Sequence, residues 1–438
     1  MNILMESLWA DEAYSALVMR SSFGEMVGLL LNNMHHVPFY YFLGFVWGRI
    51  FGFSEISLRS MSLLFLLVGM IFVFLLVKHI TKNKSLAVLT GVLVFFVPFV
   101  NYYGFEARMY TLLILLSLAS TYFFITKKIV FYAVSSVLLL YTHYFGVLFI
   151  LGQFCWYLIE KLNKRNTKPF VGIRPFVVLA ILFAPWFYVF VTQRLAIPDS
   201  TWLSTPSLSD VRRVLEILLT GNPTQLLRSI SSGLVVLALL AVDWKNLPRK
   251  VVALWVIFFS PVFSSFILSF IIEPIFYERY LITLAAGFAV LLAISIKRRY
   301  VFLLVLLTIL NGYLSVNQFF SQFRPETREA VNYVLQNLKP EDKVIYCGVI
   351  SNNLFVGRYY GLEAPIYTKE TIPYFLSESM IRPQDVISKP PMTTGRLFVM
   401  TSDNFLDCDI SDLMIDDVKH FFGVSVVSGR YIENMTKN

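Results

Sequence analysis

The stretch that decides the fold is IVFYAVSSVLLLYTHYFGVLFILGQFCWYLI, residues 129–159, which holds no Lys, Arg, Asp or Glu. A single helix over this run would be about 47 Å long at about 1.5 Å per residue. A bilayer core of about 30 Å takes only about 20 residues. The run is therefore too long for one upright span and short for two, and its middle reads Tyr141-Thr142-His143-Tyr144.

Apolar runs of this kind fill much of the chain, which has 438 residues, 57% of them hydrophobic and 15% charged. Soluble domains have about 25% charged residues, so this composition excludes a soluble globular protein and a disordered one. Further charge-free runs lie at residues 60–77, 85–105, 109–126, 176–193, 229–242, 251–272, 280–296 and 300–323. We therefore expect a polytopic α-helical membrane protein.

The Lys and Arg residues indicate the orientation, because they accumulate in short cytoplasmic loops. Five loops hold 16 of them, against 6 in the other short connections. The richer loops are residues 78–84, 127–128, 160–175, 243–250 and 297–299. Both flanks of residues 129–159 are then cytoplasmic, so this run crosses twice, as a hairpin of two short helices with His143 near its outer tip. The net charge of +9 thus records orientation and does not indicate nucleic-acid binding.

These runs predict about ten transmembrane helices, with the stretch before residue 59 and the tail after about residue 320 outside. Residues 12–31 have the pattern of an amphipathic helix on the membrane surface, with Ala13 and Met26 among the residues available for lipid. Residues 38–53 are apolar and aromatic but interrupted by Arg49 and three glycines. Counting them as a span would invert every later loop, so we expect a helix in the outer interface.

The tail changes character, because polar residues return and helix and strand patterns alternate. Its expected elements are helices at 325–338 and 410–419 and strands at 343–348, 396–401 and 424–427. The predicted domains are residues 1–323, a transmembrane domain whose first outer loop and interface helices occupy residues 1–58, and residues 324–438, a small extracytoplasmic α/β domain. We expect the latter to be a lid or docking domain. The sequence leaves open whether its Cys347 and Cys408 pair.

Polar clusters outside the tail all fall on the expected outer side. They are Asp11-Glu12, His35-His36, Glu106–Arg108, His143 and Glu278–Tyr280. Each has an ordinary structural interpretation, such as an N-cap for the Asp or an arginine that reaches lipid headgroups. Charges at a membrane boundary are nevertheless costly and tend to mark function. Five such clusters on one face predict a single outward-facing site.

The residue types in these clusters suit a reaction at a phosphate. The Asp11 carboxylate can accept a proton from a hydroxyl within hydrogen-bond reach. The guanidinium groups of Arg108 and Arg279 stay charged and match phosphate oxygens. His35 and His36 fit a phosphate, a metal or the plain start of a helix, and the sequence does not decide among these.

Six motifs occur in a fixed order along the chain. They are SLWADEA (7–13), HVPFYY (36–41), FGFSEISLR (51–59), EARMY (106–110), YTHY (141–144) and RYL (279–281). Together they resemble the GT-C superfamily of membrane glycosyltransferases over about residues 7–340. The most similar branch is related to protein O-mannosyltransferases, aminoarabinose transferases and RgtA/B/C/D-like sugar transferases.

The resemblance implies a role for each cluster. Asp11 matches the catalytic base in the first outer loop, and Glu12 its neighbour in the acceptor site. The phosphate of the donor would be bound by Arg108, Arg279 and His36, although aminoarabinose transferases carry a Lys where this chain has His36. Substrate contacts are expected from His35, Glu106, Tyr110, His143 and Tyr280.

The resemblance also implies a reaction, in which a hexose or pentose moves with inversion from a polyprenyl-phosphate donor to a hydroxyl of a lipid, glycan or protein. The expected place is the extracytoplasmic face of the plasma (inner) membrane. Whether a divalent cation takes part is left open, because some GT-C relatives bind one but the sequence shows no convincing ligand set. The family has one helix before the position of Ser7, so this chain would begin late.

Three other classes compete with this interpretation. A transporter or flippase of lipid-linked sugars would need polar residues through the bundle midplane, whereas these runs are apolar in the middle. An O-antigen polymerase or ligase would be expected to carry a long outer loop rich in Arg and His, and residues 194–228 hold no His. A structural membrane anchor for the tail would leave the outer charges unexplained.

Overall fold

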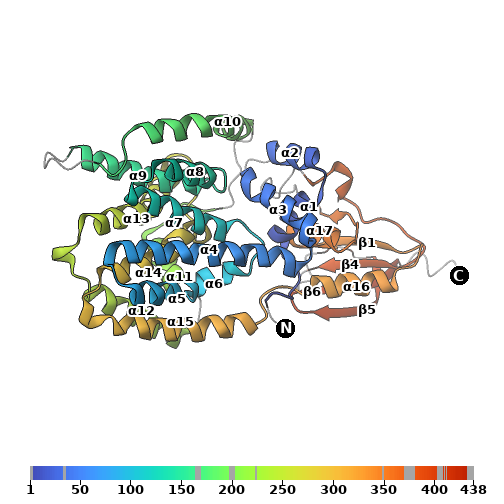
Figure 1. Cartoon of the computed structure of the whole chain (residues 1–438). Coiled ribbons are helices and arrows are strands. Elements are labelled where there is room, and N and C mark those ends of the chain that lie inside the picture. The colour runs from blue at the N-terminus through green and yellow to red at the C-terminus, as the bar shows by residue number, and fades with distance from the viewer. Residues whose placement is uncertain are drawn as a thin grey trace. The chain divides into compact units, whose positions relative to one another are not determined.

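The computed structural model describes residues 3–32, 36–162, 169–196, 203–221, 224–347, 350–368, 380–401, 408, 410 and 412–431. The chain forms two compact units, and Figure 1 labels most of their helices and strands. The helical unit comprises residues 34–43 and 59–320, and the mixed unit comprises residues 1–33, 44–58 and 321–438. The boundary at residue 320 lies close to the expected one at residue 323. The mixed unit, however, also takes in most of the first 58 residues.

The helical unit confirms the polytopic helical class. Its elements are α4 (Glu55–Thr81, beginning in the mixed unit), α5 (Lys84–Phe95), α6 (Pro98–Gly104), α7 (Tyr110–Thr126), α8 (Ile129–Leu140), α9 (Phe145–Leu162), α10 (Arg174–Ala196), α11 (Leu208–Thr220), α12 (Gln225–Leu240), η1 (Trp244–Asn246), α13 (Arg249–Ile271), η2 (Glu278–Leu281), α14 (Ile282–Ser295), η3 (Arg298–Tyr300) and α15 (Phe302–Phe320). Among the described residues, six helices are long and apolar enough to cross a membrane, or seven if the bent pair α5–α6 is one span. Shorter apolar helices are α7, α8 and α12.

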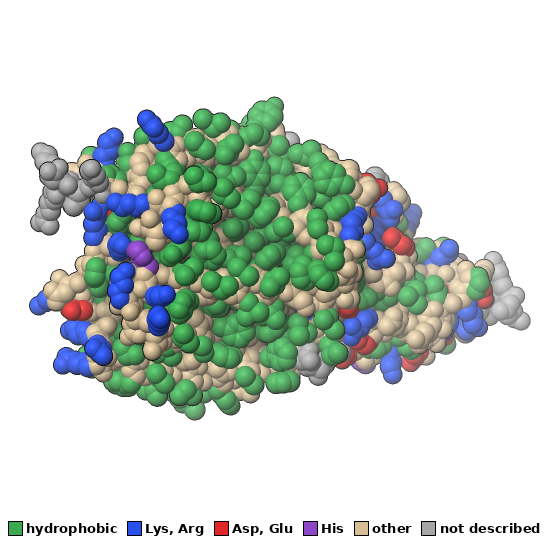
Figure 2. All heavy atoms as spheres, in the orientation of Figure 1, with side chains coloured by type: hydrophobic (Ala, Val, Ile, Leu, Met, Phe, Trp, Pro, Cys, Tyr) green, Lys and Arg blue, Asp and Glu red, His purple; other side chains and the backbone are tan. Residues whose placement is uncertain are grey.

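The surface of the helical unit is that of a protein in lipid. Large apolar side chains such as Ile71, Ile181 and Ile309 are more than half exposed. Figure 2 shows hydrophobic side chains across the visible face of this unit, with Lys and Arg gathered at one end. Soluble monomers rarely expose a continuous apolar surface of this kind.

The predicted division of residues 129–159 into two helices is confirmed. Two helices, α8 and α9, are separated by the turn 141–144. Polar contacts join them to α7, because Ser120 Oγ lies 2.9 Å from Ser136 Oγ and Gln153 Nε2 donates to Ser120 Oγ at 3.0 Å. All three side chains are buried, so they act as hydrogen-bonded links between helices.

Two parts of the helical unit differ from expectation. The run 85–105 is bent by 69° between α5 and α6, because Pro98 occupies the first turn of α6 and has no N–H to continue α5.

The expected loop 194–228 contains the helix α11. A capping box begins it: Ser207 N donates to Asp210 Oδ2 at 2.9 Å, and Asp210 N donates to Ser207 Oγ at 3.3 Å.

The mixed unit places helices beside a six-stranded sheet, which confirms the small C-terminal α/β region. Its helices are α1 (Ala10–Arg20), α2 (Phe23–Leu31), the second part of α3 (Pro38–Phe51), α16 (Thr327–Asn337), α17 (Ile350–Tyr359) and η5 (Pro383–Asp385). Its strands are β1 (Lys343–Cys347), β2 (Ile366–Tyr367), β3 (Val386–Ile387), β4 (Leu397–Thr401), β5 (Leu413–Phe421) and β6 (Val424–Tyr431). The sheet order is β3-β2-β1-β4-β6-β5; the first four strands are parallel and β6 is antiparallel to both neighbours.

Two expectations for the mixed unit are wrong. The helix expected at 410–419 is the strand β5, which forms a hairpin with β6 around Gly423. Residues 12–31 form two helices, and α1 packs on α17 with the Tyr14 and Phe355 rings 5.5 Å apart. Ala13 and Met26, expected to face lipid, are buried inside the protein.

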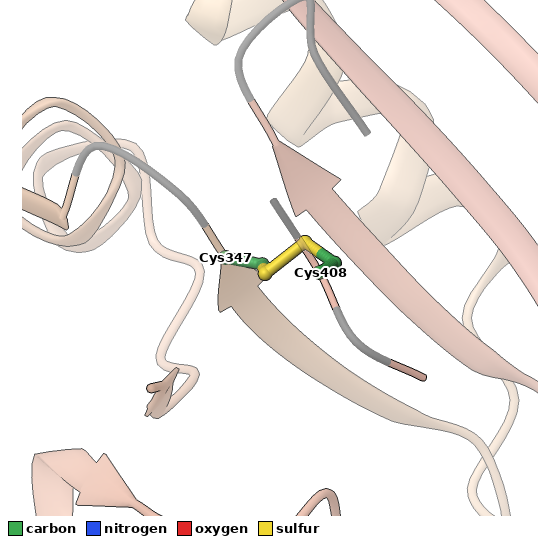
Figure 3. The surroundings of a disulfide bond; sticks show 2 residues. All are labelled: Cys347 and Cys408. Carbon is green, nitrogen blue, oxygen red and sulfur yellow. A yellow bond between two sulfur atoms is a disulfide. The ribbon is translucent and has the colours of Figure 1, made fainter. Parts of the chain in front are cut away.

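A disulfide joins the end of β1 to the chain beyond β4. Cys347 and Cys408, which are 61 positions apart in the sequence, form this bond (Figure 3). Both lie in the buried core next to the sheet. The question that the sequence leaves open is therefore settled in favour of pairing.

Candidate active site

Asp11 and Glu12 occupy the first turn of α1, in the mixed unit. Trp9, rather than Asp11, is the N-cap, and Trp9 N donates to Glu12 Oε2 at 3.4 Å. The Asp11 side chain is partly exposed, while Glu12 is fully buried. Neighbouring residues on a helix point about 100° apart, so the two carboxylates face different directions.

Glu12 has a strong ionic partner that the sequence did not predict. Arg324 Nη1 lies 2.7 Å from Glu12 Oε2, and the side chains of Arg324 and Glu12 are 3% and 0% exposed. The pair joins residues 312 positions apart. Glu12 is therefore held by an internal cation in the same unit.

The chain before α1 is also held by the C-terminal part of the mixed unit. Arg328 N donates to Ser7 Oγ at 3.1 Å, and Leu8 N donates to Tyr360 Oη at 3.0 Å. Tyr360 Oη in turn donates to Glu55 Oε1 at 2.7 Å, and Arg328 Nη1 reaches the same oxygen at 3.0 Å. Burial, followed by the charge of Glu55, raises the pKa of Tyr360, so its hydroxyl stays a donor.

In the helical unit, three connections between helices bring Arg108, His143 and Arg279 together. Arg108 lies between α6 and α7, His143 between α8 and α9, and Arg279 in η2. Desolvation, with the charges of both guanidinium groups, lowers the pKa of His143 well below its ordinary value of 6.5. Phe145 N donates to His143 Nδ1 at 3.1 Å, so the neutral ring carries its proton on Nε2.

Aromatic rings lie between the segments that carry Arg108, His143 and Arg279. The Tyr110 ring lies 6.2 Å from His143, and the Tyr280 ring 5.3 Å from it. The Arg279 guanidinium lies over two rings, 5.0 Å from the centroid of Tyr277 and 5.6 Å from that of Tyr280. These contacts restrict Arg279 to one region beside the histidine.

Glu106 and Arg108 are turned into the helical unit. Their exposed fractions are 1% and 6%. Arg108 N donates to the Glu106 carbonyl at 2.7 Å, and Ser62 Oγ of α4 donates to the Arg108 carbonyl at 3.3 Å. Arg108 is therefore not a boundary cation that reaches out to bulk headgroups.

The start of α3 is tied to the hairpin that carries His143. Phe39 N donates to the Tyr141 carbonyl at 2.9 Å. His36 precedes this point, is 7% exposed and has its ring 5.4 Å from Tyr41. His35 lies outside the described residues.

Several residues of these sites were missed by sequence reasoning. Ser269 Oγ near the end of α13 accepts hydrogen bonds from Ile275 N at 3.0 Å and Phe276 N at 3.1 Å, which folds the segment before η2. No local pattern marks Arg324, Arg328 and Tyr360, because each contacts residues that are hundreds of positions away in the sequence. Among the described residues, no group of three His, Cys, Asp or Glu side chains is arranged to hold a metal ion.

The predicted clusters thus fall into two groups. The helical unit brings together Arg108, His143 and Arg279, with Tyr110 and Tyr280 between them. It also holds Glu106 and His36. Asp11 and Glu12 belong to the mixed unit.

Comparison with known proteins agrees with the predicted resemblance. The sequence profile of the Dolichyl-phosphate-mannose-protein mannosyltransferase family matches residues 35–189, a range that includes His36, Glu106, Arg108 and His143. No curated protein matches the sequence. The fold is similar to that of ArnT from Cupriavidus metallidurans bound to undecaprenyl phosphate, with a TM-score of 0.63, 13% identity, and 97% of this chain and 94% of that chain covered. The apo state of the same protein gives a TM-score of 0.62 and 12% identity, with 97% of this chain and 94% of that chain covered.

Proposed function

We propose that this chain is a membrane glycosyltransferase of the GT-C type that transfers a sugar from a polyprenyl-phosphate donor to an acceptor hydroxyl, which the family match and the similar fold support. The observation that carries the proposal is that Arg279 lies over the Tyr280 ring, which is 5.3 Å from the His143 ring, and that the charges of Arg279 and Arg108 both act on this buried histidine. Two permanent cations beside an apolar surface suit the phosphate of a lipid. A similar fold binds undecaprenyl phosphate in ArnT.

Arg108 and Arg279 would act on the leaving group. As the bond between the anomeric carbon and the phosphate oxygen breaks, its electron pair moves onto the phosphate. Preorganised cations in a site shielded from water stabilise charge that develops in this way. Because Arg108 is buried and Arg279 is restricted by two aromatic rings, neither needs to reorganise during the step.

His143 and its aromatic neighbours would bind the sugar. A neutral His143 with a proton on Nε2 donates a hydrogen bond to a hydroxyl group without adding a third charge near the phosphate. Tyr110 and Tyr280 offer rings and hydroxyl groups in the same place. His36 and Glu106 belong to the same helical unit and would supply further polar contacts to the substrate.

Asp11 would be the general base. Its carboxylate takes the proton of the acceptor hydroxyl as that oxygen attacks the anomeric carbon opposite the phosphate, so the sugar is inverted. Asp11 is partly exposed, as a group that receives an acceptor must be. Glu12 is buried against Arg324, so we assign it to holding the turn rather than to proton transfer.

The reaction would take place on the extracytoplasmic face of the plasma membrane. The charge distribution of the loops supports this orientation. The Cys347–Cys408 disulfide supports it independently, because structural disulfides persist in oxidising compartments and are rare in the cytosol.

The test is a transfer assay with the purified chain in liposomes that contain a panel of undecaprenyl-phosphate sugars. Whole membrane extract supplies lipid, glycan and protein acceptors, and the undecaprenyl phosphate released from the added donor is measured. We expect release with at least one lipid-linked sugar and none with the matching nucleotide sugars. Movement of intact lipid-linked sugar across the bilayer without release, or transfer from nucleotide sugars, would contradict the proposal.

A further inference from the structure

The first turn of α1 is fixed from the distant C-terminal region of the chain. We propose that Arg324 is a positioning residue for the reaction: through its buried ion pair with Glu12 it sets the direction of the Asp11 carboxylate. This inference rests on the proposed role of Asp11 as the base. It gives the C-terminal region a part in catalysis although that region supplies no reacting group.

The ion pair constrains the turn tightly. Arg324 Nη1 and Glu12 Oε2 are 2.7 Å apart, and both side chains are shielded from water. Trp9 N donates to the same Glu12 oxygen. A carboxylate held from two sides cannot rotate away, and since Asp11 precedes Glu12 on the same helical turn, its direction is fixed with it.

A second set of contacts holds the chain just ahead of this turn. Ser7 Oγ accepts from Arg328 N and donates to Glu329 Oε2 at 3.2 Å, and Leu8 N donates to Tyr360 Oη. Arg324 and Arg328 flank the start of α16, and Tyr360 directly follows α17. Residues of the C-terminal region thus bind the chain on the N-terminal side of Asp11 as well as at Glu12.

A role in stability alone does not account well for such a pair. Burying two charges costs desolvation that their attraction repays only in part, so replacing a buried ion pair by neutral groups is often harmless to stability. What the pair provides is a defined geometry. That geometry is applied to the residue next to the proposed base.

The test compares four forms of the full-length protein in the liposome transfer assay: wild type, Arg324→Met, Glu12→Gln and the double variant. Each single variant leaves one buried charge without its partner, so we expect a lower Tm and a kcat reduced at least tenfold, with the KM for the donor changed less than twofold. The double variant removes both charges of this pair. We expect its Tm to return toward that of the wild type while its kcat stays low.

The double variant separates positioning from stability. If it recovers wild-type kcat together with Tm, the inference is wrong. Arg324→Lys keeps the charge and should keep more activity than Arg324→Met. The matched control is Arg358→Met, which breaks another buried pair of this unit, Arg358 with Asp385 at 2.6 Å. Its kcat should stay near that of wild type, and an equal loss of kcat at an equal loss of Tm would overturn the inference.

Failure of this inference and failure of the proposed function give different results. If Asp11→Asn is inactive while Arg324→Met and the double variant turn over like the wild type, only the positioning role is lost. If Asp11→Asn itself is active, both are lost.

Discussion

Phe145 N donates a hydrogen bond to His143 Nδ1 across 3.1 Å. The bond assigns the acceptor role to Nδ1 and leaves the proton of the neutral ring on Nε2. Desolvation and the charges of Arg108 and Arg279 lower the pKa of this histidine, so the neutral form persists in the folded protein at acidic pH. His143 is therefore a neutral hydrogen-bond donor near two cations.

This state of His143 predicts that it adds no inflection to the pH profile of transfer. The unfolded chain takes up a proton on this histidine as the pH falls below about 6.5, whereas the folded protein does so only at lower pH. His143 thus destabilises the fold progressively below pH about 6.5 and not above it. We expect the kcat/KM profiles of wild type and His143→Gln to have the same shape from pH about 5 to about 8, and a wild-type inflection lost in the variant would contradict this.

Arg279 is predicted to act on the transition state through its charge and its geometry. Arg279→Met should lower kcat by about 10²-fold, the usual cost of removing one preorganised group that stabilises developing charge. Arg279→Lys should recover only part of this loss, because an ammonium cannot present a planar fork to the phosphate while it lies over Tyr277. Steady-state kinetics with the lipid-linked donor measure both. Full activity of Arg279→Met would show that Arg279 does not bind the phosphate.

Arg108 provides the matched comparison. It is buried, so Arg108→Met should lower kcat to a similar degree, with Arg108→Lys intermediate. If Arg279→Met is inactive while Arg108→Met is stable and fully active, the phosphate is bound by Arg279 without Arg108.

The disulfide is predicted to stabilise the mixed unit rather than to take part in chemistry. Closing a loop of 61 residues stabilises a fold by about 4 kcal/mol in the chain-entropy account. We expect Cys347→Ser, Cys408→Ser and the double variant to lower the Tm by similar amounts and to be insensitive to reductant. Cys155→Ser is the control and should behave like wild type, since Cys155 is outside the disulfide. Thermal unfolding with and without reductant measures this, and an unchanged Tm in the double variant would contradict it.

The sequence predicted those parts of the fold that follow from length, charge and local pattern. The hairpin of α8 and α9 follows from a 31-residue run with cytoplasmic charges on both sides. The strand β5 was missed because Ile410, Leu413 and Met414 have helical spacing, and pairing with β6 overrides that preference. The helix α11 was missed because it lies in a long loop whose start is marked only by its capping box.

The candidate site was predictable where it consists of motif residues and unpredictable where it depends on long-range contacts. Arg108, His143 and Arg279 were chosen as boundary charges, and the structure brings them together. Arg324 lies 312 positions from Glu12 and carries no local signal. Ser269 has none either, because a serine in an apolar helix more often bonds to its own helix.

The central claim is that Asp11 is the base, and Asp11→Asn tests it most directly. The amide has a similar shape but cannot accept the proton, so kcat should fall by at least about 10²-fold while the lipid-linked donor binds with unchanged Kd. Glu25→Gln, an exposed carboxylate in the same unit, serves as the control and should leave both quantities unchanged. Loss of turnover with intact donor binding is the predicted result. Near-normal turnover by Asp11→Asn in the liposome transfer assay would contradict the account.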